Sequence, residues 1–349
     1  MPSGSASPRL AYPARLGLAR AERGLAWLAA AALLTLPLWL PNQYYLHVVI
    51  QAILFAMLAM SLNLLLGYTG QLSLGHAAFF GIGGYTSALL NKHLGWPVFL
   101  GMLAALATSG LAGYLIGRLS LRLRGAYFVL VSISFAGVVG LVAVNWSDLT
   151  NGPLGLPGIP PPELGTFAFV SKESYYYLAL AAAGLSFLVC HHLVQSRFGR
   201  ACIALRENEL LAQAVGINGT RYLVATAVVS ASMAGLAGSL YVHYGRFVSP
   251  EVFAFSYTAS MVTMAVAGGK GTLLGPVVGA ALFSALPEVL RAVISYQWQL
   301  LAYGVLLVLV VFFLPRGIVP ALAGRRRPGA SRAPATGRPA WLPRIPGAS

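Results

Sequence analysis

Residues 61–90 read SLNLLLGYTGQLSLGHAAFFGIGGYTSALL, a run that is largely apolar yet rich in glycine. Small residues allow helices in a membrane to pack closely, and Gly67 and Gly70 separate two apolar runs. A helix break at membrane depth is tolerated only where it lines a cavity or lies within protein. We predict that the polar residues and glycines around this break line a solute pathway, with hydrogen bonding between helices as the alternative role. They are Asn63, Gly67, Gly70, Gln71, Ser73, Gly75 and His76.

Further apolar stretches lie on both sides of this segment. Because lipid offers no hydrogen-bonding partners, each stretch must form a helix, and about 20 apolar residues cross the hydrocarbon core. We therefore predict an all-α membrane protein, a polytopic bundle of about ten transmembrane helices. The number falls to eight or nine if the stretch near Gly75 is re-entrant. The stretches are approximately 25–40, 44–66, 72–90, 97–117, 126–145, 175–195, 220–241, 253–268, 273–294 and 298–314.

The composition excludes a soluble protein. Hydrophobic residues make up 58% of the 349 residues and charged residues only 9%, whereas a soluble domain carries about 25% charged residues. The net charge of +15 does not indicate a nucleic-acid-binding module, because the basic residues lie between apolar runs and in a C-terminal tail. We therefore expect membrane lipid, and no nucleic acid, as a partner of this chain.

Lysine and arginine orient the predicted helices, because cytoplasmic loops are enriched in both. With the N-terminus in the cytoplasm, only Lys92, Lys172, Arg246 and Arg291 of the 23 basic residues fall outside. Both termini are therefore predicted to be cytoplasmic. The predicted organisation is a basic cytoplasmic segment (1–24), a transmembrane domain (25–318) with a cytoplasmic loop (196–220), and a disordered basic tail (319–349).

The sequence shows no group that would harvest energy or catalyse a reaction by itself. Residues 268–272 read GGKGT, whereas a nucleotide-binding P-loop requires Ser or Thr directly after the lysine. Glu288 is the only acid within an apolar stretch, although ion-driven transporters use ionisable groups inside the membrane. We predict no catalytic residue, no metal and no bound cofactor. Two alternatives stay open: a secondary transporter or channel acting alone, and an intramembrane enzyme that uses Ser73 or His76.

Residues 199–220, GRACIALRENELLAQAVGINGT, look helical and lie in the predicted cytoplasmic loop. Ile203, Leu210, Leu211 and Ala214 fall on one face of such a helix, opposite a polar surface. Helices that lie on a membrane favour Lys and Arg on the polar face, whereas this one carries Glu207 and Glu209. A short helix of mixed charge between two spans is better suited to docking against a protein.

Three blocks of the chain resemble a bacterial branched-chain amino acid ABC-importer permease of the LivM type. The resemblance extends from about Tyr44 to Ile318 and implies a multi-pass protein of the bacterial inner membrane. Its most specific part is the pattern R-x5-R-E-N-E-x2-A-x3-G-I-N at 200–218. The three blocks are SLNLLLGYTGQLSLGHAAFFGIGGYTSALL at 61–90, GRACIALRENELLAQAVGINGTRYLVATAVVSASMAGLAGSLY at 199–241, and VAGGKGTLLGPVVGAAL at 266–282.

The resemblance also implies partners and residue roles. The family's permease pairs with a second homologous permease, two cytoplasmic ABC ATPases that hydrolyse ATP, and a periplasmic or lipid-anchored substrate-binding protein. The implied substrate is a branched-chain amino acid, although the same architecture serves urea, amides and other amino acids. No charged pocket for an amino acid's carboxylate and ammonium is evident in the sequence, so we expect specificity to reside in the binding protein.

By position, the resemblance implies a coupling helix that fits a cleft in the ATPase and transmits its movement to the membrane helices. The coupling residues are Arg200, Arg206, Glu207, Asn208, Glu209 and Gly216. The third block contains a cytoplasmic glycine-rich turn formed by Gly268, Gly269, Lys270 and Gly271.

Overall fold

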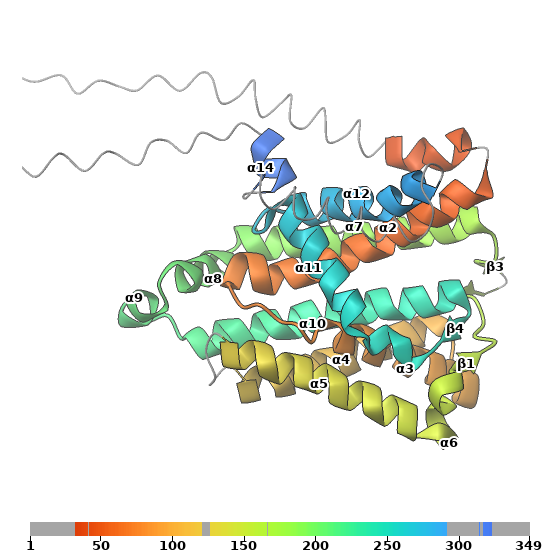
Figure 1. Ribbon diagram of the computed structural model, residues 1–349, viewed down its shortest axis with the longest axis horizontal. Helices are drawn as coiled ribbons and strands as arrows, with labels where there is room; N and C mark the ends of the chain where they lie inside the picture. Colours follow the sequence, from red (N-terminus) through yellow and green to blue (C-terminus); the bar gives the residue numbers. More distant parts are fainter. Residues whose placement is uncertain are drawn as a thin grey trace, which may run out of the picture.

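The computed structural model describes residues 32–40, 42–120, 126–165, 167–291, 314 and 317–322, and this part of the chain is mostly helical. Most of the long helices run roughly side by side along the longest axis (Figure 1). Residues 32–39 form a helical segment that precedes them. The long helices are α2 (Gln43–Asn63), α3 (His76–Leu94), α4 (Val98–Ser120), α5 (Ala126–Asn145), α7 (Lys172–Gln195), α10 (Gly219–Gly245), α11 (Phe255–Gly269) and α12 (Gly275–Arg291).

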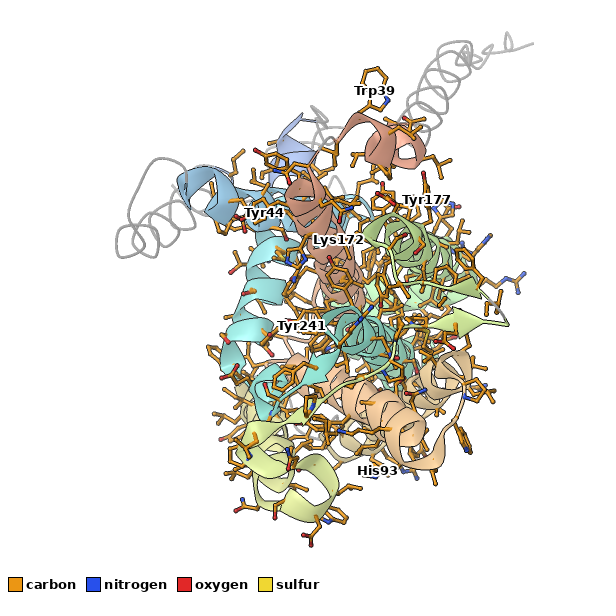
Figure 2. All side chains as sticks on the ribbon, turned by 90° about the vertical axis from the view of Figure 1, so that its right-hand side faces the viewer. Trp39, Tyr44, His93, Lys172, Tyr177 and Tyr241 are labelled. Atoms are coloured by element: carbon orange, nitrogen blue, oxygen red, sulfur yellow. The ribbon has the colours of Figure 1, made fainter. Side chains whose placement is uncertain are left out.

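Short elements lie at the two ends of the bundle. At one end, α8 (Arg197–Glu207) and α9 (Glu209–Ala214) project beyond the long helices (Figure 1). At the other end, which faces the viewer in Figure 2, β1 (Leu156–Pro157) pairs antiparallel with β4 (Phe247–Val248). The remaining short elements are the π-helix η1 (Leu64–Thr69), the 3-10 helices η2 (Gly152–Leu154) and η3 (Pro250–Phe253), α6 (Ser147–Thr150), the antiparallel pair β2 (Glu163–Leu164) and β3 (Phe167–Ala168), and α14 (Ile318–Leu322).

Two helices form the centre of the bundle. Within the most apolar 18 residues of each span, 72% of the α2–η1 segment and 67% of α10 are buried. The corresponding fractions for α4, α5 and α7 are only 33%, 22% and 17%. Helix α10 carries Ala231, Ala234, Ala237 and other small buried residues that let neighbours approach closely. The outer helices instead expose leucines such as Leu130 and Leu188. Such a surface suits lipid, because lipid tails are as apolar as leucine.

The predicted all-α membrane class is confirmed in its main features. Among the described residues, five helices are long and apolar enough to cross a membrane, namely Gln43–Thr69, Val98–Leu119, Tyr127–Asn145, Lys172–Gln195 and Gly219–Gly245. The predicted stretch 298–314 lies outside the described residues except for position 314, and the stretch 25–40 is described only from residue 32.

One predicted helix begins later than expected. The stretch 72–90 was expected to be helical from its start, but α3 begins at His76 and residues 70–75 are not helical. The cause is local: Gly70 ends η1 with φ +74°, in the left-handed region. Glycine adopts this conformation readily because it has no Cβ, so the chain leaves the helix axis there and must start a new helix.

Candidate functional site

The loop 196–220 folds as two short helices, each of which begins at a side-chain cap. Ser196 Oγ accepts hydrogen bonds from two backbone amides at the start of α8. Asn208 has extended backbone geometry (φ −158°), and its Oδ1 accepts a hydrogen bond from Leu211 N at the start of α9. The single helix predicted to run through Arg206–Glu209 is therefore wrong. Asparagine is a favoured N-cap because its side chain satisfies a backbone donor that the helix leaves free.

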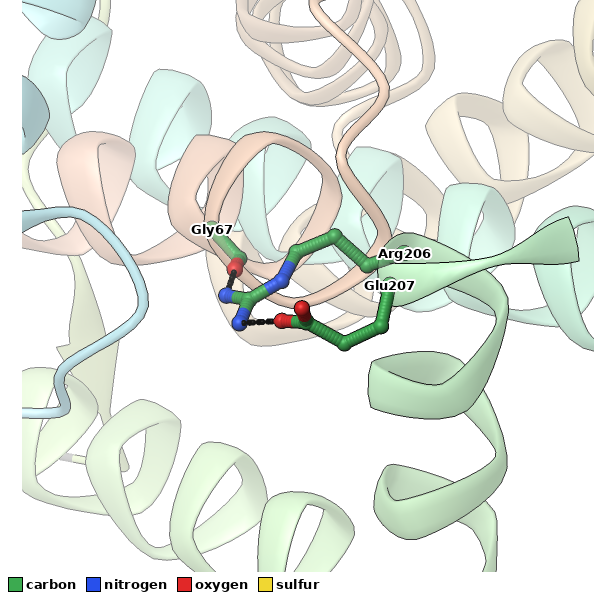
Figure 3. Close-up of polar contacts among 3 residues, drawn as sticks. All are labelled: Gly67, Arg206 and Glu207. Carbon is green, nitrogen blue, oxygen red and sulfur yellow. Dashed lines mark hydrogen bonds and ion pairs between the residues drawn. The ribbon is translucent and has the colours of Figure 1, made fainter. Parts of the chain in front are cut away.

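Arg206, near the end of α8, forms a hydrogen bond to a residue outside the 196–220 loop (Figure 3). Its Nη1 donates to the carbonyl oxygen of Gly67 at 2.6 Å, and its Nη2 donates to Glu207 Oε1 at 2.6 Å. The Gly67 carbonyl lies near the end of η1, where helix carbonyls generally lack an intrahelical partner. A guanidinium suits this position because its planar fork serves two acceptors at once and always carries its charge.

Asn63, the last residue of α2, holds a second segment against the same helix end. Its Oδ1 accepts a hydrogen bond from Gly271 N at 2.9 Å, and its Nδ2 donates to Thr272 O at 2.8 Å. Both polar atoms of the Asn63 amide are therefore bonded to the turn that joins α11 to α12. A buried amide that is satisfied on both sides fixes the two segments in one arrangement.

Two glycines permit this close approach. A Cβ on Gly67 would lie 2.2 Å from Asn63 Oδ1 and 2.4 Å from Gly271 N, so no side chain fits there. At Gly70, where φ is +74°, a Cβ would lie 3.0 Å from Arg206 Cγ. The predicted helix break is thus confirmed at Gly70, whereas Gly67 lies inside the π-helix.

These contacts join three segments that are far apart in the sequence. We call the meeting point the junction and define it as Asn63, Gly67, Gly70, Arg206 and Gly271. It contains members of all three predicted residue sets: the pathway residues, the ATPase-coupling residues and the glycine-rich turn. The predicted topology puts these three segments on the same side of the membrane, and the structure brings them into contact.

The other predicted coupling and turn residues make local contacts or lie in turns. Arg200 Nη1 donates to Gln195 O at 3.2 Å, and Glu209 Oε1 accepts a hydrogen bond from Gln213 Nε2 at 3.0 Å. Gly216 (φ +89°) lies between α9 and α10. In the glycine-rich turn, Lys270 is exposed, whereas Gly268 and Gly269 are buried.

Gly75 and His76 lie apart from the junction, in the packed interior. His76 Nε2 is 3.0 Å from Ser61 Oγ and 3.3 Å from Ser230 Oγ, and the His76 side chain is fully buried. A Cβ on Gly75 would lie 1.9 Å from the backbone oxygen of Ser132, so the start of α3 packs directly on α5. These contacts favour the interhelical role for both residues. Of the remaining predicted pathway residues, Ser73 is buried and Gln71 is half-buried.

Some candidate functional residues were not predicted, because no local sequence pattern marks them. Lys172, Arg246 and Glu251 line one cavity of about 410 Å3 at the end of the bundle opposite the junction. The sequence alone gave no indication of these charges on one cavity. Arg246 and Glu251 lie five residues apart, at the end of α10 and in η3, whereas Lys172 lies at the start of α7. No local pattern shows that the start of α7 will meet the other two.

Known proteins of similar sequence place the chain in a family. The family described as "Branched-chain amino acid transport system / permease component" matches residues 44–312. The chain belongs to this family. The permease protein LivM of the high-affinity branched-chain amino acid transport system of Salmonella typhimurium is 33% identical to it over 290 residues, which cover 76% of this chain and 68% of LivM.

One further sequence relative and one solved structure show weaker similarity to this permease-family chain. The permease protein LivH of Escherichia coli is 25% identical over 283 residues, with 76% of this chain and 91% of LivH covered. A chain of "PsaBC from Streptococcus pneumoniae in complex with Fab" superposes with a TM-score of 0.45 at 15% identity, covering 81% of this chain and 96% of that chain. The family match includes every residue of the junction, and the predicted resemblance is confirmed.

Proposed function

We propose that this chain is the membrane-spanning permease subunit of an ABC importer in the bacterial inner membrane, and that it translocates branched-chain amino acids. Its membership of the permease family supports the first part. The names of its relatives, which are branched-chain amino acid permease proteins, support the second. The proposed partners are a second homologous permease, two cytoplasmic ABC ATPases that hydrolyse the ATP, and a substrate-binding protein.

The proposed topology has ten spans with both termini in the cytoplasm. The grouping of the described loops at the two ends of the bundle supports it. The segments assigned to the cytoplasm meet at the junction, and Lys172 and Arg246, both assigned to the outside, line one cavity at the other end. Lys92, also assigned to the outside, donates a hydrogen bond to Pro157 O in the outer loop.

The surface of α9 supports a docking role for the 196–220 loop. Leu210, Leu211 and Val215 are 70%, 64% and 73% exposed, beside the exposed Glu207 and the half-buried Glu209. The helix projects from the end of the bundle (Figure 1). Exposed apolar side chains with charges around them indicate an interaction site, and we propose a cytoplasmic ATPase as the partner.

The observation that carries the mechanism is the hydrogen bond from Arg206 to Gly67. It connects the docking segment to the end of α2, one of the two most buried spans. A docked ATPase that closes on ATP would move α8, and the arginine would transmit that movement to the broken end of α2. Rigid-body movement of this kind produces alternating access in transporters that bind solute near the middle of the membrane.

A charge-reversal experiment tests this function. We expect Glu207→Arg combined with Glu209→Arg to abolish co-purification with the ATPase, while the protein still inserts in the membrane. The matched control is Asp148→Arg with Glu163→Arg, because both acids are exposed at the opposite end of the bundle. The control should co-purify normally. Normal co-purification of the Glu207/Glu209 variant would contradict the proposed docking surface.

The alternative classes give different results. A secondary transporter or channel would move solute in vesicles that contain this chain without an ATPase. An importer subunit would require the ATPases, ATP and a binding protein. An intramembrane enzyme would lose a catalytic activity on substitution of Ser73 or His76, and the contacts of His76 with two serine hydroxyls favour a structural role instead.

A further inference from the structure

The cavity of about 410 Å3 lies at the outer end of the bundle, between the start of α2, the start of α7, the end of α10 and residues 246–257. Sites for small molecules commonly enclose about 300–1,000 Å3, so the space suits a single small solute. Figure 2 views this end, where Lys172 and Tyr241 lie near the middle of the view and Trp39 and His93 lie toward its edge.

Charges of both signs line the cavity. Lys172 Nζ donates to Gln43 O at 3.1 Å, which leaves further donors of the ammonium group available. Arg246 and Glu251 are exposed, and among the described residues the structure records no ion pair for either of them. One carboxylate and two cations that do not neutralise each other within a cavity can bind a solute that carries both a positive and a negative charge.

The deeper wall of the cavity is aromatic. Tyr241 and Tyr257 both line it, with their hydroxyl groups 3.1 Å apart. Behind them, Phe80 packs against both rings at centroid distances of 5.3 Å and 5.7 Å, and Phe55 stacks on Tyr257 at 6.2 Å. Four rings from α2, α3, α10 and α11 thus close the cavity toward the centre of the bundle.

The charged groups and the aromatic wall are separated along the axis of α10. Tyr241 precedes Arg246 by five residues at the end of α10, which corresponds to about 7.5 Å along a helix axis. A solute with a charged head and a short apolar side chain can therefore place its head between Arg246 and Glu251 and its side chain against Tyr241.

We infer that this cavity binds a free α-amino acid with an aliphatic side chain. Glu251 pairs with the ammonium group, Arg246 and Lys172 pair with the carboxylate, and the side chain packs on Tyr241 and Tyr257. The inference rests on the proposed function, because it takes the bound solute to be the imported one. It separates amino acids from urea and simple amides, since an uncharged solute would leave all three charges unpaired.

The test uses the complete importer in lipid nanodiscs, without the binding protein, and measures ligand contact by saturation-transfer NMR. The probes are L-leucine, 4-methylpentanoate, which lacks the ammonium group, and 3-methylbutylamine, which lacks the carboxylate. Because a hydrogen bond to a charged group is lost, we expect Glu251→Gln to weaken leucine binding about tenfold. The same variant should bind 4-methylpentanoate as wild type does, which also shows that the variant is folded.

Arg246→Gln should show the opposite pattern: weaker leucine binding, with 3-methylbutylamine binding unchanged. Glu163→Gln, an exposed acid of the outer loop that does not line the cavity, is the matched control and should change none of the affinities. If Glu251→Gln weakens leucine and 4-methylpentanoate equally, or weakens neither, the assignment of Glu251 to the ammonium group is overturned.

The same preparation separates the two proposals. ATP-dependent leucine uptake after addition of the binding protein tests the proposed function. If uptake occurs but leucine gives no saturation transfer in the absence of the binding protein, the cavity assignment falls and the importer function stands. If uptake fails while the charge-selective pattern is observed, the cavity assignment stands and the importer function falls.

Discussion

Replacing Arg206 with methionine isolates the contact on which the proposed coupling depends. Methionine keeps the unbranched apolar stem of arginine, is shorter than arginine, and has no donor for the Gly67 carbonyl. A hydrogen bond from a charged donor is worth about 1.5–3 kcal/mol. Because the Arg206 side chain is 35% exposed, we take the lower part of this range, about 1.5–2 kcal/mol. The pair with Glu207, which is 64% exposed, adds about 0.2–1 kcal/mol.

A loss of about 2 kcal/mol corresponds to about a 30-fold change in an equilibrium. We therefore expect Arg206→Met to lower leucine uptake per ATP hydrolysed by about tenfold or more in proteoliposomes containing the whole importer. ATPase co-purification should persist, because the α9 surface is unchanged. Basal ATP hydrolysis, which the ATPases carry out, should persist as well.

Arg118→Met is the matched control for this variant. Arg118 is also an exposed arginine, but its Nη1 donates to Tyr114 Oη within its own helix, at 3.2 Å. We expect its uptake per ATP to stay near the wild-type value. Wild-type uptake per ATP in Arg206→Met, or an equal loss in Arg118→Met, would refute the transmission of movement through the Arg206–Gly67 contact.

Two further predictions concern the packing around the helix break. Gly75→Leu should abolish leucine uptake and lower the thermal stability of the purified chain, because even a Cβ there would lie 1.9 Å from Ser132 O. Gly184→Leu is its control, since Gly184 has open space around it, and wild-type uptake by Gly75→Leu would show that the close packing is incidental. Asn63→Leu removes both hydrogen bonds to the 269–272 turn and should lower the free energy of unfolding by about 2–4 kcal/mol. Denaturation that matches wild type would contradict this.

The sequence by itself determined which segments of this protein form helices. Hydrocarbon provides no hydrogen-bonding partner for the backbone, so apolar runs of the required length must be helices wherever they lie in the chain. The break at Gly70 and the short mixed-charge segment around Arg206 were also local properties, because they depend on residue types within a few positions. The exact starts of α3 and α9 were missed, since the cap at Asn208 competes with helix continuation.

Only the tertiary structure decided which of these elements meet. Arg206 and Gly67 are 139 residues apart in the chain, and Asn63 and Gly271 are 208 apart. The local sequence around each partner is the same whether or not the other lies beside it. Their contact depends on how α2, α8 and the turn before α12 pack against one another. The charged cavity arises in the same way, because packing brings Lys172 at the start of α7 to the same cavity as Arg246 and Glu251.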